Sequence, residues 1–275
     1  MNSLTKMYII FLLIFSLRIY SQEIKFYGEP KAGGIIIGKG ENVRAAWLNN
    51  KLLTVDKKGI FIFGFDRDAK GKFILKVKLK NRKMLRYEYD IEKRIYEEQK
   101  LTIQKKYVVP PKKELRKIKK EASIIKRAYS KIGQLKSAMF SSGFVYPVDS
   151  IKITGIFGSQ RILNGKLGNI HNGVDFATNE GDSVYAISDG IVQLAAENFY
   201  FNGNFVLLNH GQGLSSIYLH LSKIFVKNGN KVKKGQVIGL AGSTGRSTGP
   251  HLHLGVKWLN KRIDPMSLLE IKEIE

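Results

Sequence analysis

The sequence predicts a mainly β protein whose two parts are joined by one helix. Three observations support this prediction. Short β-branched and aromatic runs fill residues 23–95, apolar residues spaced three and four apart follow Pro110-Pro111, and short runs punctuated by glycine return from residue 151. Short runs bounded by glycine and asparagine are typical of strands, whereas spacing of three and four is typical of a helix. The 275 residues suit one large domain or two smaller ones.

Residues 1–21 have the order of a secretory signal peptide. Lys6 precedes an apolar run over residues 7–17, and Arg18 and the small residue Ser21 follow. The run of about 11 residues is short of the roughly 20 that span a bilayer, and an uncleaved anchor is the alternative. We therefore expect cleavage near Ser21 and export to the periplasm or cell envelope. Because the chain has no cysteine, a disulfide framework and a lipid-modified cysteine are excluded.

Residues 22–109 are expected to form an accessory β-domain resembling a small sandwich. The strand candidates are residues 35–37, 43–47, 59–65 and 73–79. Phe61, Phe63 and Phe65 occupy alternate positions of the third run, which predicts a strand buried on one face. Lysines alternate with apolar residues in the fourth run, so part of the positive charge belongs to ordinary sheet surface.

Residues 110–143 are predicted to hold a helix followed by a linker. After Pro110-Pro111, the apolar residues at steps of three and four are Leu115, Ile118, Ala122, Ile125, Tyr129 and Ile132. This pattern predicts one amphipathic connecting helix of about five to six turns. We expect its apolar stripe to pack on one of the domains, and contact with a membrane surface is the alternative.

Residues 144–275 are predicted to form a second domain, a compact antiparallel β-sheet or sandwich. Its short strand candidates, separated by glycine turns, are residues 184–187, 190–195, 204–209, 214–220, 236–241 and 253–258.

The net charge of +23 is concentrated in the first half of the chain. Residues 1–150 carry 33 lysines and arginines against 14 acidic residues, whereas residues 151–275 carry 13 against 9. A basic half suits peripheral contact with an anionic envelope surface, and a solvated surface without a partner is the alternative. We expect no nucleic-acid partner, because export separates the chain from nucleic acid and no binding motif is present.

All five histidines lie between His171 and His253. Imidazole and carboxylate are common zinc ligands, and no cysteine competes with them. His251 and His253 are two apart, so one strand would point both to the same side, about 6.6 Å apart. Two surface histidines on an edge strand are the alternative.

His171 and Asp175 are a second pair of candidate metal ligands, four residues apart. Four residues of straight strand span about 13 Å, too far for two ligands of one ion. Gly173 lies between them and permits unusual backbone angles, so we expect a bend there that brings both side chains together. Asp175 as a plain turn residue is the alternative.

Two further histidines have less specific surroundings. His220 shares strand parity with Tyr218, so we expect both to face one side. His220 then serves either as a catalytic auxiliary or as a core histidine that satisfies one hydrogen bond. His210 lies at a predicted turn, and we interpret it as structural or surface.

Residues from about 153 to 265 resemble the lysostaphin/LytM-type zinc endopeptidases, which cut peptide bridges in bacterial peptidoglycan. The motifs that carry the resemblance are Gly155-Ile156-Phe157-Gly158, His171-Asn172-Gly173-Val174-Asp175, Tyr218-Leu219-His220-Leu221 and Thr248-Gly249-Pro250-His251-Leu252-His253. Residues 181–186, 189–192, 232–239 and 242–247 match as well. A lone His-x-His would be weak, but these motifs also follow one another in the right order.

The resemblance implies one Zn²⁺ ion held by His171, Asp175 and His253, with a water in the open position. It also implies that His220 and His251 are the catalytic histidines that do not bind the metal. Residues 144–275 would then be the zinc metallopeptidase domain of an exported enzyme that hydrolyses peptide cross-links of peptidoglycan. The accessory region would place the enzyme on the wall or restrain access to the site.

Two other functions stay open at this point. One is a non-enzymatic, wall-binding regulator on the same fold, although such relatives typically lack metal ligands that this chain retains. The other is a peptidase for a different protein substrate. Arg161, beside the extra Gln160, suits a structural ion pair or contact with a peptide carboxylate, and Asn204 suits a turn or substrate contact.

Overall fold

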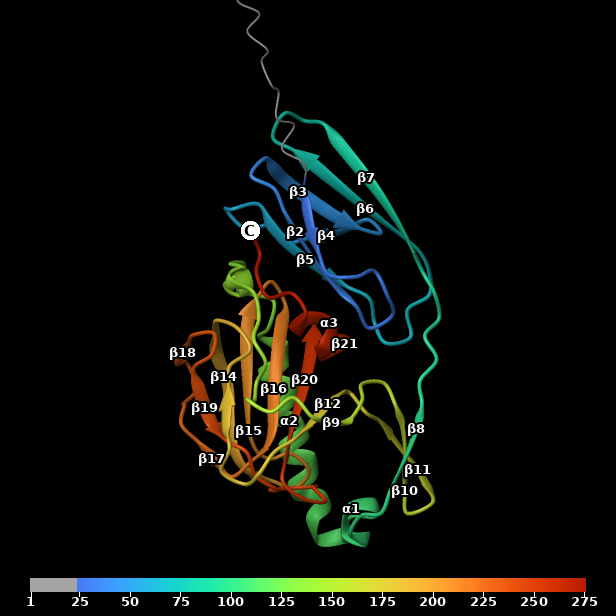
Figure 1. Cartoon of the computed structure of the whole chain (residues 1–275), viewed down its shortest axis with the longest axis vertical. Coiled ribbons are helices and arrows are strands. Elements are labelled where there is room, and N and C mark those ends of the chain that lie inside the picture. Colours follow the sequence, from blue (N-terminus) through green and yellow to red (C-terminus); the bar gives the residue numbers. More distant parts are fainter. Residues whose placement is uncertain (1–23) are drawn as a thin grey trace, which may run out of the picture.

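The computed structural model describes residues 24–275, so the predicted signal peptide lies outside the described residues. The described part is mainly β, as predicted, with a sandwich at one end and a larger sheet at the other (Figure 1). An extended segment runs down one side and joins the two. None of the helices within residues 24–275 combines the length and hydrophobicity that a membrane span requires.

Seven strands form the N-terminal sandwich. They are β1 (Lys25–Tyr27), β2 (Ile35–Lys39), β3 (Val43–Leu48), β4 (Lys51–Leu53), β5 (Ile60–Gly64), β6 (Gly71–Leu79) and β7 (Met84–Ile91). One sheet has the order β1-β2-β5 and the other β4-β3-β6-β7, and every pair is antiparallel. The predicted sandwich is thus confirmed.

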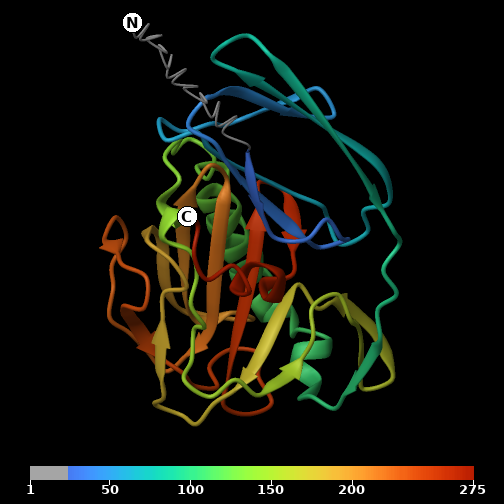
Figure 2. The same cartoon turned by 45° about the horizontal axis from the view of Figure 1, so that its top comes forward.

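Strand β5 is buried on both faces, so the prediction of a strand buried on one face is wrong. Its phenylalanine face packs on the second sheet, and the adjoining Phe65 meets Phe73 with ring centroids 4.9 Å apart. The opposite face meets the C-terminal part, since a Cβ at Gly64 would lie 2.7 Å from the Ile263 side chain. At the strand edge, Gln212 Nε2 donates to Ile60 O at 2.9 Å. One continuous hydrophobic core therefore connects the sandwich to the rest of the chain, as the close approach in Figure 2 also indicates.

The larger sheet is antiparallel throughout. Its strands are β9 (Ile153–Gly155), β12 (Gly173–Ala177), β14 (Gly190–Phe199), β15 (Gly203–Gly211), β16 (Leu214–Leu221), β18 (Lys231–Val232), β20 (His251–Trp258) and β21 (Lys261–Ile263). Their order is β18-β14-β15-β16-β20-β12-β9, and β21 pairs with β20. A small sheet of order β13-β19-β17 lies nearby, formed by Ser183–Tyr185, Val237–Leu240 and Lys223–Ile224.

The connecting segment contains the predicted helix, but in a shorter form. The helical elements are α1 (Lys105–Val108), the 3-10 turns η1 (Lys112–Glu114) and η2 (Met139–Ser142), and α2 (Leu115–Ser130). The 16 residues of α2 make about four and a half turns, because Gly133 soon follows with φ +106°. A last helix, α3 (Pro265–Leu269), begins at its N-cap Asp264.

Helix α2 packs on the larger sheet, but the predicted apolar stripe is only partly covered, because Leu115 and Ala122 are exposed. Ala128 is buried, and Glu121 Oε2 accepts a hydrogen bond from Tyr200 N, beside β14, at 2.9 Å. Lys257 Nζ lies 4.1 Å from the centroid of the Tyr129 ring.

A third, mixed sheet combines both halves of the chain. Its strands are β8 (Glu98–Leu101), β10 (Gln160–Leu163) and β11 (Lys166–Ile170), in the order β11-β10-β8. Strands β10 and β11 form an antiparallel hairpin, but β8 pairs with β10 in parallel, with Gln99 opposite Arg161. None of these strands was predicted. Because β8 precedes the helix in sequence, the N-terminal part contributes directly to this side of the molecule (Figure 1).

Candidate active site

Strand pairing brings Asp175 and His253 together. Strand β12 pairs with β20 so that Asp175 lies directly opposite His253. Side chains of directly opposed residues point to the same face of a sheet. His253 Nδ1 consequently lies 2.7 Å from Asp175 Oδ1.

His171 reaches the same point from the loop before β12. Its Nδ1 donates to Ile156 O at 2.9 Å, so Nε2 is presented to the site. This Nε2 lies 3.0 Å from both Asp175 Oδ1 and His253 Nδ1. The expected bend does not arise from a left-handed Gly173, because its φ is not positive. His171 instead lies outside the strand, which removes the distance problem of a straight four-residue span.

These three side chains suit a metal ion. One ligand atom from each of His171, Asp175 and His253 lies within 4.8 Å of the others. Glycines make room for them, since a Cβ at Gly155 would lie 2.5 Å from Asp175 Oδ2 and one at Gly173 would lie 2.7 Å from His253 Nε2. Two imidazoles and a carboxylate are a donor set typical of catalytic zinc sites. The residues therefore fit the ion that the sequence implies.

The electrostatics of the group favour its ligand forms. Burial raises the pKa of the Asp175 carboxyl, but the close His171 and His253 rings outweigh that effect and hold the pKa well below its usual value. Burial lowers the pKa of His253 to about 4 against the opposing effect of Asp175. A carboxylate and a neutral imidazole are the protonation states that metal binding requires.

His220 reaches the site through an irregular backbone. Tyr218 lies opposite Leu254 in the core, whereas Leu219 lies opposite His253. Regular alternation would therefore turn His220 to the core with Tyr218, and the expectation that both face one side is wrong. His220 has φ +67°, which breaks the alternation and turns its ring toward the site.

His251 and His220 form a pair next to the three-residue group. Their ring centroids are 4.8 Å apart, and His251 Nε2 lies 4.0 Å from Asp175 Oδ1. His220 Nδ1 donates to Thr244 O at 2.8 Å and His251 Nδ1 donates to Gly249 O at 2.9 Å, so each ring has Nε2 available. Burial, together with the nearby His251 and His253 rings, lowers the pKa of His220 to about 3. His220 is therefore a neutral imidazole beside the group, with Nε2 available as an acceptor.

Residues 169–265 match the model of Peptidase family M23. The chain contains an M23 peptidase domain. Peptidoglycan DD-endopeptidase ShyA of Vibrio cholerae is 49% identical over 110 residues, which cover 39% of this chain and 25% of ShyA. Peptidoglycan DD-endopeptidase ShyB of the same organism is 42% identical over 144 residues, which cover 51% of this chain and 33% of ShyB. The matched region thus spans about a quarter to a third of these relatives.

A solved structure is similar over a larger share of the chain. The crystal structure of a putative peptidase M23 from Pseudomonas aeruginosa aligns with a TM-score of 0.62 and 27% identity. The alignment covers 88% of this chain and 95% of that chain. It therefore extends beyond the M23 domain into at least part of the N-terminal sandwich.

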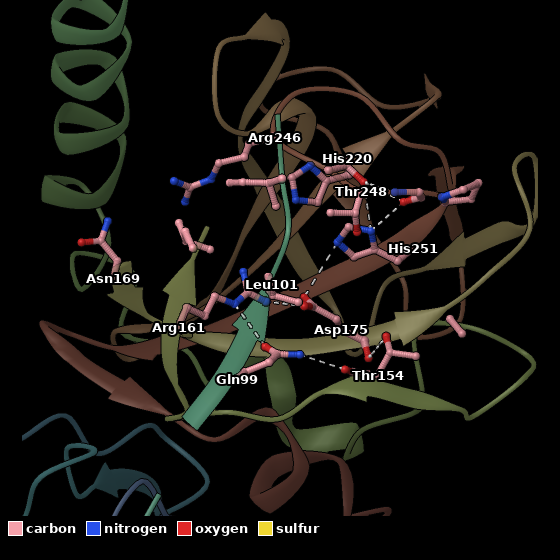
Figure 3. Close-up of a pocket in the computed structure, with 16 residues that line it drawn as sticks. Gln99, Leu101, Thr154, Arg161, Asn169, Asp175, His220, Arg246, Thr248 and His251 are labelled. Carbon is pink, nitrogen blue, oxygen red and sulfur yellow. Dashed lines mark hydrogen bonds and ion pairs between the residues drawn. The ribbon is translucent and has the colours of Figure 1, made fainter. Parts of the chain in front are cut away.

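A groove of about 320 Å³ opens at the site and is lined by Asp175, His220 and His251 of the five site residues (Figure 3). One wall comes from β8 and β10, which contribute Gln99, Leu101, Arg161 and Leu163. The opposite wall is the loop before His251, residues 246–250. Gln99 and Arg246 were not predicted from the sequence as groove residues. The signal for Arg246 was present, since it is the one charged residue in the glycine-rich motif before His251.

The remaining sequence candidates have structural contacts. Arg161 Nη2 forms an ion pair with Asp175 Oδ2 at 2.5 Å, and its Nε donates to Gln99 Oε1 at 3.3 Å. His210 is fully buried, with Nδ1 2.7 Å from Asp189 O, and burial lowers its pKa to about 4. His210 is therefore structural, but it lies buried within β15 and not in the predicted turn or at the surface. Asn204 Oδ1 accepts from Asn198 N at 2.9 Å, within the β14–β15 turn.

Gly173→Ala is expected to destabilise the M23 domain and to weaken metal binding. The new Cβ would press against Leu254 O and lie 2.7 Å from His253 Nε2, so the β12–β20 pairing must shift. We expect a loss of about 1–3 kcal/mol in the free energy of unfolding, measured by chemical denaturation. Gly249→Ala is the control, because nothing lies within 4 Å of its new Cβ. Equal stability of the two variants would contradict the prediction.

Proposed function

We propose that the chain is an exported zinc metalloendopeptidase that hydrolyses peptide cross-links of bacterial peptidoglycan. In this proposal His171, Asp175 and His253 hold one Zn²⁺ ion, and His220 and His251 are catalytic. The observation that carries it is the convergence of these five side chains beside one groove in an M23 domain. We assign residues 144–275 to the peptidase domain and residues 22–109 to the accessory domain, joined by residues 110–143, although β8 of the accessory part pairs with β10 and lines the groove.

The chemistry divides between the metal and the two histidines. When bound, Zn²⁺ lowers the pKa of water and polarises a peptide carbonyl, which makes hydrolysis possible near neutral pH. The free Nε2 atoms of His220 and His251 accept and return protons on the groove side of the site. The ring that has accepted a proton, and the N–H it then carries, also stabilises the oxyanion that develops on the scissile carbonyl. Their carbonyl partners, Thr244 O and Gly249 O, hold the rings in the required tautomer.

The names of the relatives support a cross-link as the substrate. ShyA and ShyB are both named peptidoglycan DD-endopeptidases, and their similarity to this chain lies mainly in the M23 region. We therefore propose the bond between D-alanine and diaminopimelate as the scissile bond. A groove open to solvent along β8 and β10 suits an extended peptide better than a closed pocket would.

The basic first half of the chain supports a second contact, with the anionic envelope surface. Helix α2 and the turn before it expose a run of cationic side chains, namely Lys112, Lys113, Arg116, Lys117, Lys119 and Lys120. Because exposed charges are screened by salt, this contact should weaken as ionic strength rises. Its role in the proposal is to hold the enzyme near its polymeric substrate.

Purified sacculi test the proposal directly. We expect the zinc-loaded chain to convert cross-linked muropeptide dimers to monomers, as measured by liquid chromatography and mass spectrometry. In the same samples, the fraction of protein that pellets with the sacculi should fall as salt rises. Unchanged cross-links in the presence of bound zinc would refute the enzymatic proposal and favour the wall-binding regulator. Cleavage of casein but not of sacculi would favour a protein substrate.

A further inference from the structure

We propose that Arg246 binds a free carboxylate of the substrate next to the scissile bond, and thereby selects cross-links that carry one. This inference rests on the proposed peptidase function and specifies its substrate class. Arg246 lies five residues before His251, in the loop that forms one wall of the groove. Figure 3 shows its side chain extending from that wall toward the side of the groove that holds Arg161 and Asn169.

Arg246 is held in place without using its hydrogen-bonding capacity. Its backbone N donates to Phe201 O at 2.9 Å, which anchors the loop. Its guanidinium carbon lies 4.7 Å from the centroid of the Phe201 ring, an arrangement that restrains the cation through its face. Stacking on a ring leaves the N–H groups at the edge of the guanidinium available for an acceptor.

Within the described part of the chain, Arg246 has no carboxylate within ion-pair distance, although its side chain is largely buried. The groove has one acidic residue, Asp175, and that carboxylate already contacts Arg161 and the histidines. The groove thus has two arginines against one carboxylate, so positive charge is in excess. Burial, and then the Arg161 guanidinium, lower the pKa of Arg246. A ligand carboxylate would neutralise that excess.

The geometry of the Arg246 guanidinium group suits a carboxylate group of the substrate. Its planar fork matches the two carboxylate oxygens in a bidentate pair. The neutral Ser247, Thr248 and Asn169 line the same groove and provide donors without adding charge. A cross-link in which the residue on the amine side of the scissile bond keeps a free carboxylate therefore fits, whereas the corresponding carboxamide leaves Arg246 unpaired.

Matched substrates test this inference on the full zinc-loaded chain. We would compare two cross-linked peptides that differ only in a free carboxylate or a carboxamide on the residue that supplies the scissile nitrogen. We expect wild type to have a kcat/KM about 10- to 100-fold higher for the carboxylate, the range for a charged hydrogen bond. In Arg246→Gln that ratio should approach one, and Arg246→Lys should restore part of it. Arg44→Gln removes an exposed charge outside the groove and should keep the wild-type ratio.

The outcomes separate this inference from the proposed function. Equal cleavage of both peptides by wild type, or an unchanged ratio in Arg246→Gln, would overturn the inference and leave the peptidase intact. If neither peptide is cut, the proposed function fails, and calorimetric binding of the same two peptides decides the inference. Tighter binding of the carboxylate peptide that Arg246→Gln abolishes would support it, and equal binding would refute it. Thermal unfolding of each variant checks that the variant is folded.

Discussion

Asp175→Asn is expected to abolish both zinc binding and peptide hydrolysis. The carboxylate lies 2.7 Å from His253 Nδ1 and 3.0 Å from His171 Nε2, so it is central to the group. An amide keeps the shape but removes the charge, and it leaves the Arg161 cation without its partner. Residues that merely orient metal ligands are worth about 10- to 100-fold in affinity, so a ligand should be worth more than about 100-fold. Zinc content after dialysis and hydrolysis of sacculi measure the two effects.

Asp182→Asn is the matched control for this change. Its carboxylate accepts a hydrogen bond from Asn179 N at 2.7 Å in a turn away from the metal group. Zinc should raise the melting temperature of wild type and of the control, because a ligand that binds the folded state stabilises it. Asp175→Asn should show no such rise. A variant at Asp175 that keeps its zinc and its activity would remove this residue from the proposed ligand set.

His220→Ala and His251→Ala should each lower kcat by about 100- to 10,000-fold while zinc stays bound. Both rings adjoin the proposed ligands without being members of the three-residue group. Their loss removes proton transfer and oxyanion stabilisation but leaves the metal donors in place. Single-turnover hydrolysis, with zinc measured in the same sample, separates these effects.

His210→Asn provides a histidine control outside the groove. His210 bridges Asp189 O and Ser216 Oγ inside the core, so its replacement should cost stability and leave kcat of the folded fraction unchanged. The same series distinguishes an enzyme from a regulator. Cells that depend on the protein should lose its phenotype with His220→Ala if it acts as an enzyme. They should retain it if the protein only binds the wall.

The three residues of the metal group could be predicted from the sequence, but the backbone conformation of the surrounding site could not. The resemblance to the lysostaphin/LytM-type endopeptidases implied His171, Asp175 and His253, and the structure brings them together. The left-handed turn at His220 carries no local sequence signal, because it arises where β16 leaves its pairing with β20. The alternation rule for strands therefore predicted the wrong face of β16 for the His220 side chain, although His220 itself was expected in the site.

The mixed sheet was missed for a related reason. Residues 98–101 read Glu-Gln-Lys-Leu, which is neither β-branched nor aromatic, so local propensity gives no strand. Their conformation is set by parallel pairing with β10, about 60 residues away in sequence. The alternation in residues 59–65 also could not show that both faces of β5 are buried. The C-terminal part of the chain, which is distant in sequence, covers the second face.

The position of β8 limits how this protein can be truncated to a smaller fragment. A fragment that starts at residue 144 would contain every proposed ligand and both proposed catalytic histidines, yet it would lack Gln99 and Leu101 from the wall of the groove. It would also expose the edge of β10 where β8 now pairs. Such a fragment would be a differently shaped enzyme, and its substrate preference would not report that of the intact chain. Changes in the segment that joins the two parts can therefore alter what the peptidase accepts while its chemical groups stay the same.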